Sequence, residues 1–198
     1  MNGPEVINNF LPQEDFNKLS SHINSRPRET SIASDGEGSL TSNAEVNKHI
    51  ITIENSFRQV KQDLDDYELK DVLFRYENKT GFLHHDLNRR GKRKYSLILY
   101  TQESREGGEI VFPFYDSSLN KTTNAVTETC SRLHKEKKYV STDENLNKFI
   151  IENKNKLYSL KPKRNLGVII DNDNNNLWHF VTPTSQERSC AVLFWERK

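Results

Sequence analysis

Three side chains that favour metal ions stand at spacings that would let them share one ion. His84 and Asp86 are two residues apart in the run 82–87, which predicts a short strand. Alternate residues of a strand point to the same face, so His85 would face away from the ion. His179, in a second strand-like run at 177–181, would supply a third donor. Two imidazoles and one carboxylate on one face of an ion leave the other coordination positions open.

A fourth residue, Arg188, follows His179 by nine positions and opens the last predicted strand. Its planar guanidinium can donate two parallel hydrogen bonds to a carboxylate. A His-x-Asp sequence is common by chance, and a histidine beside a tryptophan is often only a core residue. The functional interpretation therefore depends on the combination of metal donors with a carboxylate-binding arginine.

The elements that must position these residues are helices first and short strands afterwards. Apolar residues recur at steps of three and four from Val46 to Leu64, which predicts an amphipathic helix. From about residue 69 the period changes to two. Strand-like runs then follow at 72–76, 82–87, 95–101, 109–112, 167–171, 177–181 and 188–195. This order predicts a mostly β fold, a sandwich or barrel, with packing helices.

Composition and charge narrow the classes of protein. The 198 residues suit a single domain, 1–198, and a formal net charge of +1 gives no basic excess for nucleic acid. Cys130 and Cys190 form no CxxC pair, so no disulfide framework or zinc knuckle is indicated. Neither a signal-peptide pattern nor a membrane-spanning run is found, which predicts a cytoplasmic protein. The long polar stretch 114–158 predicts an inserted segment.

The chain resembles the prolyl-4-hydroxylase-like branch of the 2-oxoglutarate/iron(II) oxygenases. That family carries His-x-Asp, a distal His, and an Arg or Lys shortly after it, as at His84, Asp86, His179 and Arg188. Further segments resemble segments of the family and occur in the same order along the chain. They are 7–11, Arg75-Tyr76, Tyr100, 107–113, 160–164, 179–183 and 191–197. The resemblance spans nearly the whole chain, and segment 114–158 is the main departure from it.

The resemblance implies a double-stranded β-helix, also called a jelly roll or cupin-like fold, and a set of roles. His84, Asp86 and His179 would bind iron(II), with 2-oxoglutarate and O2 as co-substrates and ascorbate as a compatible reductant. Arg188 would bind the distal carboxylate of 2-oxoglutarate. Tyr100 would donate a hydrogen bond to the same group, and Tyr76 would lie on the co-substrate side. Because halogenating relatives lack the metal carboxylate, Asp86 favours hydroxylation.

The resemblance favours hydroxylation of a prolyl residue in a peptide or protein, without a nucleic acid or membrane partner. A hydroxylase of a free amino acid or another small molecule on the same scaffold stays open. A non-catalytic metal-binding jelly-roll module and a zinc hydrolase are rivals from other classes, and both leave Arg188 without a role. The basic cluster 89–94 indicates either a solvated hairpin loop or a site for an acidic substrate.

Overall fold

The computed structural model describes residues 3–25, 38–39, 44–77, 86, 93–104, 107–113, 152, 157–174, 177–182 and 188–198. The N-terminal elements are β1 (Glu5–Asn8), α1 (Gln13–Ser25), β2 (Gly38–Ser39), α2 (Ala44–Val60) and the 3-10 helix η1 (Gln62–Asp66). The later strands are β3 (Tyr67–Glu77), β4 (Arg93–Tyr100), β5 (Ile110–Phe112), β6 (Tyr158–Leu160), β7 (Leu166–Asp171), β8 (Phe180–Val181) and β9 (Arg188–Arg197).

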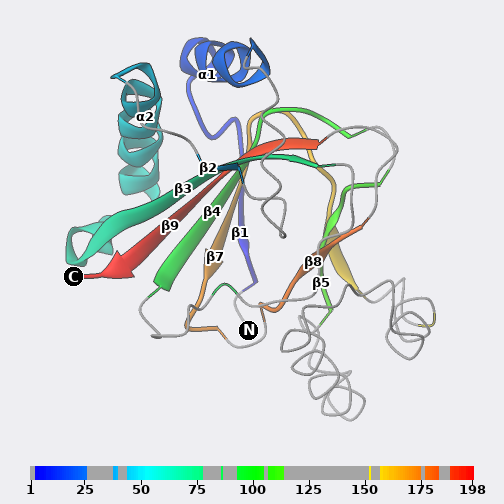
Figure 1. The fold of residues 1–198 in the computed structure, drawn as a ribbon. Coiled ribbons are helices and arrows are strands. Elements are labelled where there is room, and N and C mark those ends of the chain that lie inside the picture. Colours follow the sequence, from blue (N-terminus) through cyan, green and yellow to red (C-terminus); the bar gives the residue numbers. More distant parts are fainter. Residues whose placement is uncertain are drawn as a thin grey trace.

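The strands form two sheets. Six strands pair in the order β1-β7-β4-β9-β3-β2, and three pair in the order β6-β5-β8. The pairs within both sheets are antiparallel. Helices α1 and α2 lie on one side of the six-stranded sheet, and β5 and β8 lie on the other (Figure 1). The predicted mostly β fold with packing helices is therefore confirmed.

The central strands bury side chains on both faces. On β4, Leu97 and Leu99 belong to the cluster under the helices, whereas Ile98 and Tyr100 belong to the cluster that includes β5. The strand β9 divides in the same way, with Ala191, Leu193 and Trp195 on the helix side and Cys190, Val192 and Phe194 on the other. Because successive side chains alternate between faces, one strand serves both cores.

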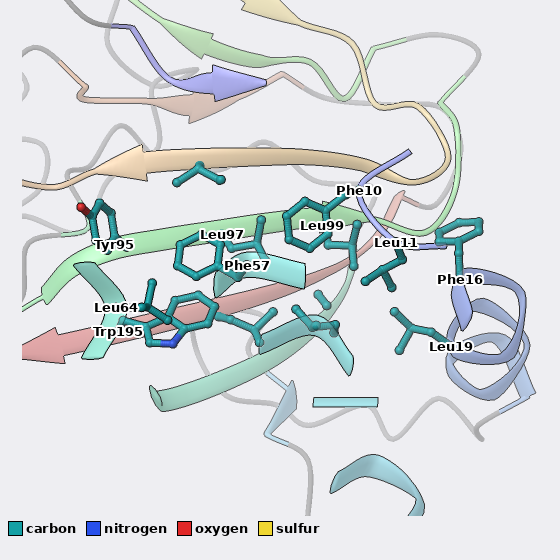
Figure 2. Packing of buried hydrophobic residues seen from close by; sticks show 14 of the residues in the cluster. Phe10, Leu11, Phe16, Leu19, Phe57, Leu64, Tyr95, Leu97, Leu99 and Trp195 are labelled. Atoms are coloured by element: carbon teal, nitrogen blue, oxygen red, sulfur yellow. The ribbon is translucent and has the colours of Figure 1, made fainter. Parts of the chain in front are cut away.

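The helix-side core combines aliphatic side chains with an aromatic stack (Figure 2). The Phe57 ring of α2 stacks on the Trp195 ring of β9, with 4.2 Å between centroids and an interplanar angle of 17°. Truncating a buried aromatic residue of this kind typically costs about 3–5 kcal/mol. The predicted helix 46–64 was wrong at its C-terminal end: α2 ends at Val60, Lys61 is extended, and buried Leu64 lies in η1.

Asn165 anchors the N-terminal segment to the end of β4. Its backbone has φ 59, a left-handed conformation that asparagine tolerates better than most residues. The Leu11 N–H donates to Asn165 Oδ1 at 2.9 Å, and Asn165 Nδ2 donates to the Leu11 carbonyl at 2.8 Å. The Asn165 N–H also donates to the Tyr100 carbonyl at 2.9 Å. This asparagine therefore fixes the chain beside Tyr100.

The remaining differences from expectation concern short segments. The strand β6 was not predicted; it forms because Tyr158 to Leu160 pair with β5, directly after a bend at Leu157. The expected strand 177–181 is regular only at β8. Most of the expected strand 82–87 and of the segment 114–158 lies outside the described residues. None of the described helices combines the length and apolar character that crossing a membrane requires.

Candidate functional site

The structure brings Asp86 and His179 together although they are far apart in the sequence. Asp86 has no regular secondary structure, and His179 makes an isolated bridge immediately before β8. The His179 Nε2 atom lies 3.7 Å from Asp86 Oδ2. Both residues are buried, with 8% of Asp86 and 3% of His179 exposed. A carboxylate and an imidazole, two of the three predicted metal donors, therefore lie together in the interior of the protein.

The second nitrogen of His179 faces a backbone carbonyl. His179 Nδ1 lies 3.0 Å from the Leu177 carbonyl oxygen, and a carbonyl can only accept a hydrogen bond. The proton of a neutral His179 ring is therefore on Nδ1, which leaves the Nε2 lone pair on the side of Asp86. Metal-binding histidines are commonly oriented in this way, with the non-ligating N–H donated to a carbonyl or carboxylate.

Neighbouring contacts hold the His179 segment in place. The Phe112 ring of β5 packs against the His179 ring, with centroids 5.6 Å apart. Beyond β8, the Thr182 N–H donates to the Glu109 carbonyl at 3.0 Å, and the Glu109 N–H donates to Thr182 Oγ1 at 3.0 Å. The Thr182 hydroxyl in turn donates to Glu109 Oε2 at 2.5 Å. These contacts join β5 to the His179 segment at both ends of the β5–β8 pairing.

The Asp86–His179 geometry fits a bound cation. An unprotonated ring nitrogen and a carboxylate oxygen both carry lone pairs, so both can act as ligands to a cation that lies between them. At 3.7 Å the atoms are beyond ordinary hydrogen-bond range. Two ligands about 2.1 Å from a shared ion lie roughly 3–3.6 Å apart at the usual angles. The pair could therefore hold a divalent metal after a shift of a few tenths of an ångström.

Of three other predicted site residues, His84 is not described by the structure, and Arg188 and Tyr76 are described only by their backbones. His84, the third predicted metal ligand, lies outside the described residues; among those described, no further His, Cys, Asp or Glu completes a three-ligand group. Arg188 is the first residue of β9, where its backbone pairs with Glu77 of β3. Tyr76 on β3 pairs with Ser189. The side chains of Arg188 and Tyr76 are not among those described.

Tyr100 is fully buried in the cluster between the two sheets. It ends β4, and its cross-strand partner on β9 is Cys190, two residues after Arg188. Cys190 belongs to the same cluster and is 2% exposed, as a small buried hydrophobic residue would be. The register thus brings Tyr100 and the Arg188 backbone to the same end of the six-stranded sheet.

Sequence reasoning missed the residues that support this site. The role of the Leu177 carbonyl could not be predicted from the sequence, because every residue carries a backbone carbonyl. Phe112 was noticed only as part of the segment 107–113, and its contact with His179 joins positions far apart in the chain. Glu109 and Thr182 lie within the recognised segments 107–113 and 179–183, but only the pairing of β5 with β8 brings them together.

Comparisons with known proteins support the fold. No protein-family model matches the sequence, and no curated protein sequence matches it. Solved structures that match include prolyl hydroxylases and an oxidoreductase of the 2OG-Fe(II) oxygenase family from Burkholderia pseudomallei. A prolyl-4-hydroxylase from Pseudomonas putida superposes with a TM-score of 0.63 at 16% identity, covering 100% of this chain and 94% of its own.

Two further similar structures are prolyl hydroxylases with a ligand bound. The viral collagen prolyl hydroxylase of Paramecium Bursaria Chlorella virus-1, as a 2OG complex, has a TM-score of 0.59 at 15% identity, covering 100% and 97% of the two chains. The Trichoplax adhaerens enzyme, in complex with a hypoxia inducible factor peptide, has a TM-score of 0.57 at 13% identity, covering 100% and 84%. The chain therefore has the double-stranded β-helix fold of these oxygenases.

Replacing His179 tests whether the buried pair binds metal. We expect His179→Ala to weaken Mn(II) binding to the metal-free protein by about 100-fold or more, because a ligand is lost. Titration calorimetry measures the affinity without requiring turnover. His22→Ala is a matched control, since His22 lies on α1 against the ring of His49. Equal Mn(II) affinity in His179→Ala and wild type would contradict the metal site.

Proposed function

We propose that the chain is an iron(II)- and 2-oxoglutarate-dependent dioxygenase that hydroxylates a prolyl residue in a peptide or protein. The observation that carries the proposal is the buried contact of His179 Nε2 with Asp86 Oδ2. It joins two donors of the predicted triad on the fold that these oxygenases share. A non-catalytic module with a purely structural metal ion would explain the donors but gives no role to Arg188.

Asp86, His179 and His84 would hold the metal, with His84 completing the set of two imidazoles and one carboxylate. When bound, iron with 2-oxoglutarate and O2 would supply the oxidation, in which one oxygen atom enters the substrate and the other enters succinate as CO2 leaves. His179 would keep a fixed orientation because its Nδ1 hydrogen is held by the Leu177 carbonyl. Phe112 and the buried setting of the pair would keep bulk water from the ligands.

Arg188 would bind the distal carboxylate of 2-oxoglutarate. Its strand β9 presents Cys190, Val192 and Phe194 toward the cluster between the sheets, and Arg188 occupies the same alternation two residues earlier. Tyr100, buried in that cluster beside Cys190, would donate a hydrogen bond to the same carboxylate. Tyr76 would line the co-substrate side from β3. A planar guanidinium suits this task because it can donate two parallel hydrogen bonds.

The prolyl substrate is the finer part of the proposal. It is supported by the collagen prolyl hydroxylase and by the peptide complex among the structures that share the fold. Asp86 favours hydroxylation, since it would fill the coordination position that a halide would need. A free amino acid or another small molecule is the alternative substrate class on the same scaffold.

Substitution of Arg188 tests the co-substrate role. Arg188→Ala should raise the Kd for 2-oxoglutarate by about 100-fold, because a charge-assisted bidentate contact is removed, while Mn(II) affinity stays unchanged. Arg197→Ala on the same strand is the matched control, because Arg197 donates to Asp173 at 2.8 Å on the surface. If both variants bind 2-oxoglutarate like wild type, the proposed role of Arg188 is wrong.

A substrate screen tests the reaction itself. The iron-loaded protein with 2-oxoglutarate is offered proline-containing peptides, free proline and other free amino acids, and products are identified by mass spectrometry. We expect a gain of one oxygen atom on proline within a peptide, and none with Asp86→Ala. Oxidation of a free amino acid alone would replace the peptide assignment with the small-molecule alternative.

A further inference from the structure

Two buried hydroxyl groups join the exit of β4 to the start of β9. The Oγ1 of Thr101 and the Oγ of Ser189 are hydrogen-bonded to each other. Both residues have 0% of their surface exposed. The Thr101 N–H also donates to the Ser189 carbonyl at 3.0 Å. Ser189 is therefore tied to Thr101 by its backbone and by its side chain.

The hydroxyl pair is connected to α1. Ser20, which is 3% exposed, donates through its hydroxyl to the Thr101 carbonyl at 3.4 Å. Asn24 Nδ2 donates to Ser20 Oγ at 3.4 Å, and Gln102 Nε2 donates to Asn24 Oδ1 at 3.1 Å. A polar chain thus leads from the surface of α1 to the first residues of β9. Buried polar groups linked in this way favour one arrangement, because breaking any contact leaves a polar group without its partner.

This chain of hydrogen bonds has a functional meaning because it ends next to Arg188. Ser189 follows Arg188 directly, and its backbone also pairs with Tyr76 of β3. Ser20 reaches the pair from the helix side of the sheet, whereas Cys190, the next residue, belongs to the cluster on the other side. The hydroxyl pair would therefore influence a co-substrate only through the backbone of β9.

We propose that Thr101 and Ser189 are positioning residues, which set the start of β9 so that Arg188 meets the carboxylate of 2-oxoglutarate. This inference rests on the proposed function of Arg188. A bidentate contact needs its donor placed to within a fraction of an ångström, and small misplacements cost affinity steeply. The end of a strand is also where local opening is easiest, so a tie there has the most effect.

Ser189→Ala and Thr101→Val test the role, since each removes one hydroxyl. Each should raise the Kd for 2-oxoglutarate of the Mn(II)-loaded protein by about tenfold and leave Mn(II) affinity unchanged. Thr101→Ser keeps the hydroxyl and should bind 2-oxoglutarate nearly as wild type does. In the metal-free protein, amide hydrogen exchange should accelerate at 189–191 in Ser189→Ala and stay unchanged at 194–196.

Ser96→Ala is the matched control. It removes a buried hydroxyl that accepts from Asn172 Nδ2 at 2.9 Å, where both residues have 0% exposed surface. Ser96 lies on the same strand, five residues before Thr101, or about 16 Å away along β4. It should lower stability without changing the Kd for 2-oxoglutarate.

The double variant Thr101→Val/Ser189→Ala separates positioning from stability. Removing both partners leaves no buried hydroxyl from the pair unsatisfied, so resistance to urea should recover toward wild type. The Kd for 2-oxoglutarate should stay raised because the tie is absent. A Kd that recovers together with stability would overturn the positioning role.

The outcome for the wild type separates the two proposals. If wild type binds 2-oxoglutarate and Ser189→Ala binds it as tightly as Ser96→Ala does, the positioning role fails and the proposed function stands. If wild type itself does not bind 2-oxoglutarate, the proposed function fails and this role fails with it.

Discussion

The six-stranded sheet must be covered on both faces, and the rest of the structure follows from that constraint. Strands β4, β7 and β9 place apolar side chains alternately on each side. At about 25 cal/mol per Å2 of apolar surface, leaving either face in water would remove much of the stability of so small a domain. The helices α1 and α2 cover one face, and the strand β5 with its neighbours covers the other. The space between the sheets is where Asp86, His179 and Tyr100 are buried.

Burying an imidazole beside a carboxylate is costly unless something satisfies both groups. Here the ring is oriented by the Leu177 carbonyl, and its other nitrogen faces Asp86. A catalytic metal site needs this combination of fixed ligands and restricted access to water. The two faces of the sheet thus differ: the helix side contributes stability through contacts such as Phe57 with Trp195, and the opposite side holds the buried Asp86–His179 pair.

Much of this could be predicted from the sequence. The steps of three and four from Val46 located α2, and the period of two located β3, β4, β7 and β9, because buried faces impose those periods. The spacing of His84 and Asp86 and the later His179 predicted a shared site, and two of these three residues do meet. Sequence could not predict β6, whose three residues become a strand only through pairing with β5. Nor could it predict Asn165 binding Leu11 or Thr101 binding Ser189, since small polar residues acquire such partners only from the tertiary fold.

We propose that the buried pair belongs to a metal site that also binds 2-oxoglutarate. The most direct measurement is an anaerobic titration of the iron(II)-loaded protein with 2-oxoglutarate, followed by admission of air. We expect a weak visible charge-transfer band that saturates with 2-oxoglutarate, and then formation of succinate. Bound iron with neither the band nor succinate would contradict the proposed oxygenase and would favour a metal-binding module or a zinc enzyme.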